Sequence, residues 1–329
     1  FWRPLVARLK IMAKLDIAET RMPQDGKIRF RYDGRRVELR VATLPTVNGN
    51  EDMVLRILAS SEPIPLEKMG MSPANYERFL AAIHQPYGLI LCVGPTGSGK
   101  TTTLHSSLGV INTPDKKIWT AEDPVEITQD GLRQVQVSGK IGYSFAVALR
   151  AFLRADPDVV MVGEMRDEET ARTAIQASLT GHMVFSTLHT NSAPETITRL
   201  LDMGINPFTF ADALVAVLAQ RLCRRLCDRC ATAHQASPEE FNQVAGLYGR
   251  EALAERLQIS EPSQLVLWRG EGCRHCSNNG YRGRTALHEL LVVDDEIKAA
   301  IERSAPVAEV RDVAIAAGLV TLVQDGIEK

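Results

Sequence analysis

The chain has 329 residues, of which 45% are hydrophobic and 24% are charged, and its formal net charge is −2. This length allows two or three domains. No stretch approaches the ~18 consecutive apolar residues of a membrane-spanning helix, and the first residues do not form a signal peptide, so we expect a cytoplasmic protein. The near-neutral charge argues against a general nucleic-acid-coating protein, because phosphate contacts require excess lysine and arginine. The sequence begins inside a helical pattern and stops without a cap or breaker, so we expect part of a longer protein.

The N-terminal 62 residues predict a small domain with one helix and three antiparallel strands. An amphipathic helix is expected over residues 5–15. Residues 28–32 and 37–41 alternate in the manner of strands on either side of Asp33-Gly34, which predicts a hairpin. A third strand is expected over residues 53–58. The pattern is therefore that of a small α+β unit.

The middle of the chain alternates apolar strands with helical segments, which indicates an α/β fold with a mostly parallel sheet. Ser72-Pro73 predicts the start of a helix that runs to about Ile83. The expected strands cover residues 89–93, 118–121, 159–162 and 183–186. The expected segments are a small domain over residues 1–62, a linker over 63–71, the α/β core over 72–222, a cysteine-containing subdomain over 223–290 and a helical extension over 291–329.

The strongest motif is a glycine-rich loop that follows the apolar run 89–93. It fits G-x-x-x-x-G-K-[ST] at every position, and the strand, loop and helix signals arrive in the required order, which a chance glycine-rich turn would not give. Glycines let backbone N–H groups turn toward phosphates, the lysine neutralises the β/γ charge and the threonine hydroxyl ligates Mg²⁺. We therefore predict that the chain binds ATP and magnesium through a P-loop of Gly94, Pro95, Thr96, Gly97, Ser98, Gly99, Lys100, Thr101 and the following Thr102.

A second motif places an acid just after an apolar strand. Residues 159–162 are apolar and Glu164 follows them. A carboxylate at the tip of the strand beside a P-loop can hold the water shell of Mg²⁺ or polarise an attacking water. A buried strand followed by an acid is common on its own, but together with the P-loop it predicts a nucleotide hydrolase.

Two further stretches carry polar groups with open interpretations. Glu122, Asp123 and Glu126 follow a predicted strand, and His182 and His189 bracket another. Acids in loops are usually solvated and single histidines are seldom catalytic. From the residues alone, the simpler interpretations are favoured.

The cysteines form two C-x-x-C pairs, Cys227 with Cys230 and Cys273 with Cys276. Residues 231–272 separate the pairs, a longer gap than the roughly 15 to 20 residues of a compact zinc ribbon. In a cytosolic chain, thiols stay reduced and four thiolates more often close a structural zinc site than form disulfides. The arginines near the first pair suggest either phosphate contacts or a solvated or inter-subunit face, and the acidic total favours the second. These arginines are Arg221, Arg224, Arg225 and Arg229.

These motifs, in this order and spacing, resemble those of the secretion ATPase family that powers type II secretion and type IV pilus assembly (the GspE/PilB type). The resemblance covers nearly the whole chain. It includes the P-loop (Walker A), the acidic stretch near Glu122 (aspartate box), the strand before Glu164 (Walker B) and the stretch with both histidines (histidine box). Further segments that match family signatures are residues 9–13, 23–26, 149–158, 163–167 and 220–222.

The resemblance implies roles for particular side chains. Glu122 would position the lytic water, with Glu126 a less favoured alternative, and Glu164 would act on the metal side. His182 and His189 would sit beside the γ-phosphate. Arg40 and Arg56 match the arginines that stabilise charge on the transferred phosphoryl group of a neighbouring subunit. The alternative for Arg40 is a strand-edge charge. The family's tetracysteine insert supports zinc at Cys227, Cys230, Cys273 and Cys276.

The resemblance also implies an architecture and an activity. We expect a RecA-like P-loop core preceded by part of a PAS-like domain, assembled as a homohexamer that hydrolyses ATP. The motor would act at the inner membrane on a platform protein that assembles pilins or pseudopilins. A DNA-translocating or conjugation-type ATPase is the main alternative, which the cysteine insert and the aspartate box disfavour. A non-enzymatic nucleotide switch is disfavoured by the presence of Glu122 and Glu164.

Overall fold

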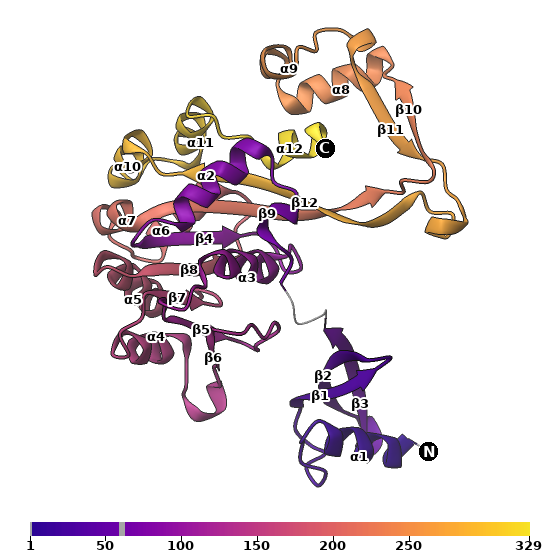
Figure 1. Ribbon diagram of the computed structural model, residues 1–329, viewed down its shortest axis with the longest axis vertical. Helices are drawn as coiled ribbons and strands as arrows, with labels where there is room; N and C mark the ends of the chain where they lie inside the picture. Colours follow the sequence, from indigo (N-terminus) through magenta and orange to yellow (C-terminus); the bar gives the residue numbers. More distant parts are fainter. Residues whose placement is uncertain (1, 59–62) are drawn as a thin grey trace. The chain divides into compact units, whose positions relative to one another are not determined.

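The computed structural model describes residues 2–58 and 63–329, so the expected domain limit at residue 62 lies outside the described residues. The chain forms two compact units. The small unit contains residues 1–63 and 126–130, and the main unit contains residues 64–125 and 131–329. Figure 1 labels their elements.

The small unit is a three-stranded antiparallel sheet covered by one helix, as the α+β prediction states. Its elements are α1 (Trp2–Met12), β1 (Gln24–Tyr32), β2 (Arg35–Thr46) and β3 (Asn50–Leu58), with β2 in the centre. Ile28 and Val41 on one sheet face are buried with Ala13. The predicted hairpin is present, and Asp33 and Gly34 at its turn have φ values of 49° and 72°. The turn fits these residues because aspartate and glycine tolerate positive φ.

The first helix ends earlier than expected. It stops at Met12 rather than at residue 15. Lys14 has a φ of 58°, and the N–H of Leu15 donates to the carbonyl of Lys10 at 2.9 Å. A left-handed residue that redirects the backbone in this way closes a helix.

The main unit is built on a seven-stranded sheet with the order β12-β9-β4-β8-β7-β5-β6. Every neighbouring pair is parallel except β12 with β9. Its strands are β4 (Gly88–Val93), β5 (Ile118–Glu122), β6 (Arg133–Gln136), β7 (Val159–Val162), β8 (Met183–Leu188), β9 (Leu214–Leu226) and β12 (Tyr281–Val292). Its helices are α2 (Pro73–Ile83), α3 (Lys100–Ile111), α4 (Phe145–Leu153), α5 (Glu168–Leu179), α6 (Ala193–Asp202), α7 (Pro207–Ala213), α10 (Asp295–Glu302), α11 (Val307–Ala316) and α12 (Leu322–Glu328).

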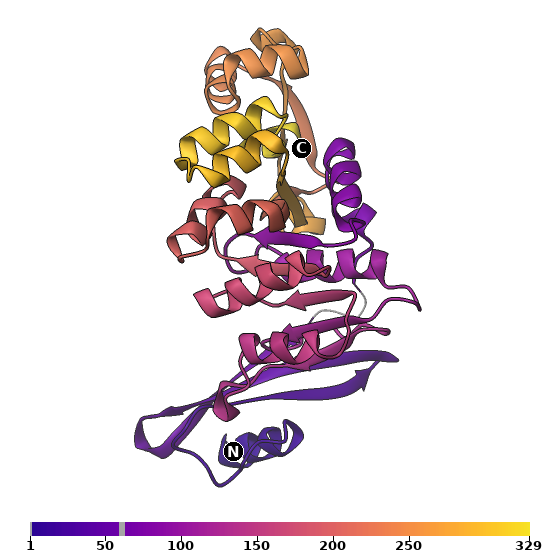
Figure 2. The same ribbon diagram turned by 90° about the vertical axis from the view of Figure 1, so that its left-hand side faces the viewer.

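Both faces of this sheet are buried, as Figures 1 and 2 show by the helices on either side. Alternate residues of a strand point to opposite faces. Leu89, Leu91 and Val93 of β4 pack in one core with residues of α4 to α7, α10 and α11. Ile90 and Cys92 pack in a second core with α2 and α3. The apolar run 89–93 is continuous because a central parallel strand is covered on both sides.

The predicted strands are all confirmed, but the sheet extends further than the sequence analysis proposed. β9 continues through the expected limit at residues 222/223, and β12 pairs with it over most of its length and crosses the limit at residue 290. The expected linker also differs, because Leu66 and Met69 are buried against the core beside α3. These residues therefore belong to the main unit.

The residues between β9 and β12 form a smaller layer. It contains a two-stranded antiparallel sheet and two helices: β10 (Ala231–Gln235), β11 (Val266–Gly270), α8 (Pro238–Tyr248) and α9 (Arg250–Leu257). Phe241, Tyr248 and Leu253 lie in a small core of this layer. The hydroxyl of Tyr248 donates to Glu328 of α12 at 2.6 Å.

The outer edge of β12 is covered by α12. The N–H of His288 donates to Asp325 Oδ2 at 2.8 Å, and Lys329 Nζ donates to the carbonyl of Ala286 at 2.7 Å. Asp325 and Lys329 also pair with each other at 2.6 Å. Two side chains therefore bond backbone groups of an edge strand.

Candidate nucleotide site

The P-loop connects the carboxyl end of β4 to the first residue of α3. Gly97 and Gly99 have φ values of 80° and 90°, a region that favours glycine. Lys100 is 9% exposed, and its Nζ donates to the carbonyls of Gly94 at 2.7 Å and Pro95 at 3.1 Å. Burial lowers the pKa of Lys100, while the negative charges of Cys92, when ionised, and Glu164 act in the opposite direction. The loop places a cation at a helix N-terminus, which is a binding site for phosphate.

The predicted acids lie at the same edge of the sheet as this loop. Glu122 is the last residue of β5, Glu164 comes two residues after β7 and His189 comes directly after β8. The strands are parallel, so their carboxyl ends meet at one edge, where open α/β sheets bind ligands. The sequence analysis placed Glu164 on the strand beside the P-loop strand, which is wrong: β8 lies between β4 and β7.

Glu122 is held by three side chains. It accepts hydrogen bonds from Thr120 Oγ1 at 2.7 Å and Gln134 Nε2 at 3.0 Å, and it lies 3.2 Å from His105 Nε2. Burial alone raises the pKa of Glu122, but the hydrogen bonds and charge of these partners outweigh it and lower the pKa below its ordinary value. The carboxylate is therefore ionised and fixed in orientation at neutral pH.

Glu164 has a more open environment. It pairs with Arg166, and its Oε2 lies 3.5 Å from His189 Nε2. Its side chain is 15% exposed. Carboxylate and hydroxyl oxygens are among the hard donors that Mg²⁺ prefers, so Glu164 at this edge and Thr101 in the first turn of α3 are side chains of the right type for a magnesium ion.

The two predicted histidines are not brought together. His182 precedes β8 and His189 follows it, and this strand has six residues, so about 20 Å of extended chain separates them. The carbonyl of His182 accepts from the N–H of Gly88, which begins β4, and its Nδ1 lies 2.9 Å from the carbonyl of Ala177. Within one chain, His182 therefore lies at the edge of the sheet opposite the P-loop, contrary to the expected pair. Glu126 belongs to residues 126–130, which are grouped with the small unit.

Arg40 and Arg56 are neighbours in the small unit. They lie directly opposite each other on β2 and β3, and Lys27 on β1 lies opposite Arg40. Directly opposed residues project from the same sheet face. Arg40 Nη2 lies 3.5 Å from Asp25 Oδ1. Because β2 is the central strand, the alternative of a strand-edge charge does not describe Arg40.

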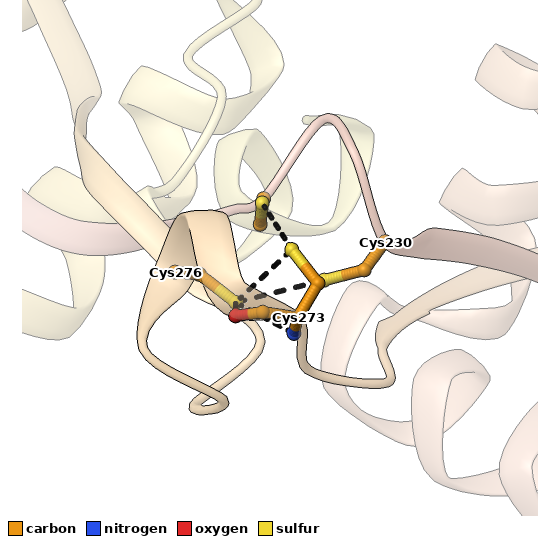
Figure 3. Close-up of side chains that lie close together, drawn as sticks. Cys230, Cys273 and Cys276 are labelled. Atoms are coloured by element: carbon orange, nitrogen blue, oxygen red, sulfur yellow. Dashed lines mark hydrogen bonds between the residues drawn. The ribbon is translucent and has the colours of Figure 1, made fainter.

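The four predicted cysteine ligands converge. Their sulfur atoms all lie within 4.8 Å of one another, and Figure 3 shows the side chains of Cys230, Cys273 and Cys276 close together. The separations are 3.9 Å for Cys227 to Cys273, 3.7 Å for Cys230 to Cys276 and 3.8 Å for Cys273 to Cys276. A tetrahedral ZnS₄ centre with Zn–S bonds of about 2.3 Å requires S···S separations of about 3.8 Å. The cluster therefore has the donors and the size for zinc.

Sequence reasoning assigned no role to two buried polar side chains at the sheet edge that carries the P-loop, Glu122 and Glu164, which is called the phosphate edge below. One is His105 on α3, which contacts Glu122. The other is Gln220 on β9, which bonds the P-loop. Gln220 directly follows the apolar run 214–219 and is the last buried residue of β9, and a polar residue at that point was a signal that could have found it.

The fold and the site define a P-loop NTPase with a RecA-like sheet. The chain belongs to the family described as "Type II/IV secretion system protein", whose model matches residues 2–329. Across the part of the chain that the structure describes, no helix has the length and apolar character needed to cross a membrane.

Several relatives and solved structures are similar to the chain. It is 48% identical over 326 residues to the type IV pilus assembly ATPase PilB of Thermus thermophilus, covering 99% of the chain and 35% of that protein. It is 48% identical over 302 residues to the type II secretion system ATPase E of Vibrio cholerae, covering 92% of the chain and 57% of that protein. The crystal structure of the pilus retraction motor PilT with bound ADP aligns with a TM-score of 0.61 at 27% identity, covering 93% of this chain and 77% of that one. The chain thus spans between about a third and three fifths of the two curated relatives.

Proposed function

We propose that the chain is the ATP-hydrolysing part of a motor for type IV pilus assembly or type II secretion. The observation that carries this proposal is the placement of Lys100, Glu122 and Glu164 at one edge of the parallel sheet. The 48% identity to a pilus assembly ATPase and to a type II secretion ATPase supports the choice of process.

The residues divide the chemical work. Lys100 and the N–H groups of the P-loop bind the β- and γ-phosphates, and Thr101 and Glu164 hold the magnesium ion, which offsets phosphate charge when bound. Glu122, fixed by its three partners, orients the attacking water. His189, whose Nε2 lies 3.5 Å from Glu164 Oε2, would respond to the γ-phosphate. Arg40 and Arg56 of a neighbouring subunit supply positive charge to the transferred group, a contribution that is typically worth ~10³ to 10⁵ in rate.

We further propose that six copies assemble and that the assembly acts on a platform protein at the inner membrane, from the cytoplasmic side. This part rests on the resemblance to the family. Zinc in the four-cysteine cluster would serve structure, because four thiolates leave no open position for substrate.

Steady-state ATPase activity measured together with light-scattering mass tests chemistry and assembly at once. Activity per chain should rise with concentration as the oligomer forms. A mixture of Lys100→Ala and Arg56→Ala chains should recover turnover that neither has alone, because one supplies the arginine and the other an intact P-loop. No recovery, with both variants folded and assembled, would remove the role of Arg56 in a neighbouring subunit.

The DNA-translocating alternative makes a different prediction. Single-stranded DNA should stimulate such an enzyme at physiological salt, with an effect that falls as salt rises. We expect no stimulation from this chain. A clear, salt-sensitive stimulation would favour the alternative.

A further inference from the structure

Gln220 is a fully buried amide at the point where β9 passes the P-loop. Its exposed fraction is 0%, and the six residues before it on β9 are apolar and buried. A buried amide costs free energy unless its polar atoms are bonded. In Gln220, the amide nitrogen and the amide oxygen each form a hydrogen bond.

The two contacts of Gln220 reach the phosphate-binding loop and the first turn of the helix that follows it. Its Nε2 donates to the carbonyl of Ser98 at 2.7 Å, within the loop. Its Oε1 accepts from the hydroxyl of Thr103 at 2.6 Å, in the first turn of α3. A hydroxyl has one proton to donate, and the competing carbonyl of Gly99 is farther away at 3.3 Å. The amide therefore bridges the loop and the helix that together form the anion site.

The loop also lies directly against the backbone and side chain of Gln220. A Cβ added at Gly94 would be 2.3 Å from the carbonyl oxygen of Gln220, and one added at Gly99 would be 2.7 Å from its Nε2. Two of the motif's glycines thus leave the space that this contact needs. Contacts this close restrict where the loop can move.

The geometry points to Gln220 as a positioning residue that holds the P-loop in its phosphate-binding shape. Only a side chain that both donates and accepts satisfies Ser98 and Thr103 together: a carboxylate only accepts, and a lysine only donates. A neutral amide also adds no negative charge beside bound phosphates. The predicted effect of Gln220 on MgATP affinity rests on the proposed function. Its predicted effect on the conformation of the P-loop does not.

Hydrogen exchange without nucleotide tests the effect on the loop. The N–H of Ser98 donates to Pro95 and that of Thr103 donates to Gly99, so both report opening of the turn. Gln220→Leu, which keeps similar volume but neither polar contact, should speed exchange at these amides at least tenfold relative to amides of the sheet. Unchanged exchange in a folded variant would overturn the proposal. This readout remains valid even if the chain bound no ATP, so it separates failure here from failure of the proposed function.

A second variant covers the case in which Gln220→Leu does not fold. In Gln220→Glu, the new carboxyl group can donate to Ser98 only while protonated. Binding of MgATP, measured relative to the parent at each pH, should be near normal at pH 5.5 and at least tenfold weaker at pH 8. His288, which lies opposite Gln220 on β12, does not titrate in this range, because burial and the charge of Lys329 lower its pKa to about 3. A pH-independent loss would indicate a packing role only, and no loss at any pH would also refute the bridge.

Matched substitutions complete the test. Thr103→Val removes one contact of the bridge and should weaken binding, whereas Thr103→Ser keeps the hydroxyl and should restore it. Gln176→Glu makes the same chemical change at an exposed position of α5, so its affinity should follow the parent at every pH. Equal affinities for Thr103→Val and Thr103→Ser would contradict the bridge.

Discussion

The phosphate edge of the main sheet and the four-cysteine cluster are built in different ways, although β9 leads from one to the other. At the phosphate edge, the polar groups already have protein partners: Lys100 bonds two carbonyls and Glu122 is held by three side chains. In the cluster, the four sulfur atoms mainly approach one another. Thiolates at such short separations repel each other unless a cation lies between them. Protein groups hold the polar side chains of the first site, whereas the second site presents four sulfur atoms with the donors and spacing that a metal ion would bind.

The comparison predicts that the two sites respond to different changes. Neutralising a single charge at the phosphate edge should greatly reduce the rate of ATP hydrolysis, while the fold around it persists. The cluster should lose local structure when the metal is removed, while nucleotide binding persists. The following predictions run from the largest expected effect to the smallest.

Neutralising the acids of the phosphate edge should give the largest effect. Glu164→Gln and Glu122→Gln should each reduce turnover by ~10² or more while MgATP binding is retained, because groups that orient water or hold the metal act mainly on the chemical step. Lys100→Ala should lose binding as well. Steady-state turnover and equilibrium binding of each variant provide the check, and parent rates in both glutamine variants would refute the assigned roles.

Removing a cysteine should release zinc and loosen only the residues near the cluster. We expect one zinc per chain by elemental analysis, lost in Cys227→Ser and Cys276→Ser. Limited proteolysis should then cut near the cysteines first, since metal binding orders such knuckles. Cys223→Ser is a matched control, because Cys223 is not among the four clustered cysteines, and it should retain the metal. A metal-free parent that resists protease would show that the cysteines only pack.

The buried side chain of His288 should make the free energy of unfolding depend moderately on pH. Its side chain is buried, and among the described residues neither ring nitrogen has a hydrogen-bond partner. Its folded pKa is lowered to about 3 by burial and the charge of Lys329, from an ordinary value of 6.5. Between these values the unfolded chain binds the proton and the folded chain does not, so stability falls as pH falls below 6.5.

The size of this effect can be measured by urea unfolding. Between pH 7.5 and 5.5, the parent should lose about 1.4 kcal/mol more than His288→Leu, which is the value of one pKa unit. His84→Leu, which changes an exposed histidine, should keep the pH dependence of the parent. Parallel curves for the parent and His288→Leu would show that His288 is not held neutral.

Removing one of the three partners of Glu122 should give the smallest effect. Thr120→Val keeps the volume of a buried side chain and removes one donor, so the pKa of Glu122 should rise toward its ordinary value of 4.5. Turnover at neutral pH should fall less than tenfold, because His105 and Gln134 still hold the carboxylate. A loss as large as that of Glu122→Gln would mean that Thr120 itself contacts the reacting groups.

Local patterns in the sequence predicted the elements whose signals are local. The P-loop, the strands before Glu122 and Glu164 and the cap at Ser72 each depend on a few consecutive residues, and all are present. Ser72 Oγ, for example, accepts from the N–H of Asn75 at 3.3 Å. The convergence of the four cysteines was predicted from their chemistry, because two C-x-x-C pairs are typical of a shared metal site. No local pattern indicated where in the fold the two pairs would meet.

The features that were missed depend on pairing between distant segments. β12 joins the main sheet by pairing with β9. The cysteine-containing segment lies between these two strands in the sequence, so no local pattern predicts that they pair. The expected pair of His182 and His189 failed because a strand runs between them and carries each to a different edge. The role of Gln220 was hidden for the same reason, since its partners Ser98 and Thr103 are more than a hundred residues away in sequence.

The cover that α12 gives to β12 bears on how copies of this chain can meet. An uncovered edge strand offers a row of free N–H and C=O groups on which a strand from another molecule can pair, and this is a common route to aggregation. Asp325 and Lys329 bond the backbone of His288 and Ala286 at that edge, so an incoming strand would have to displace an ion pair before it could bond there. Self-association of this chain by sheet extension at β12 is thereby disfavoured.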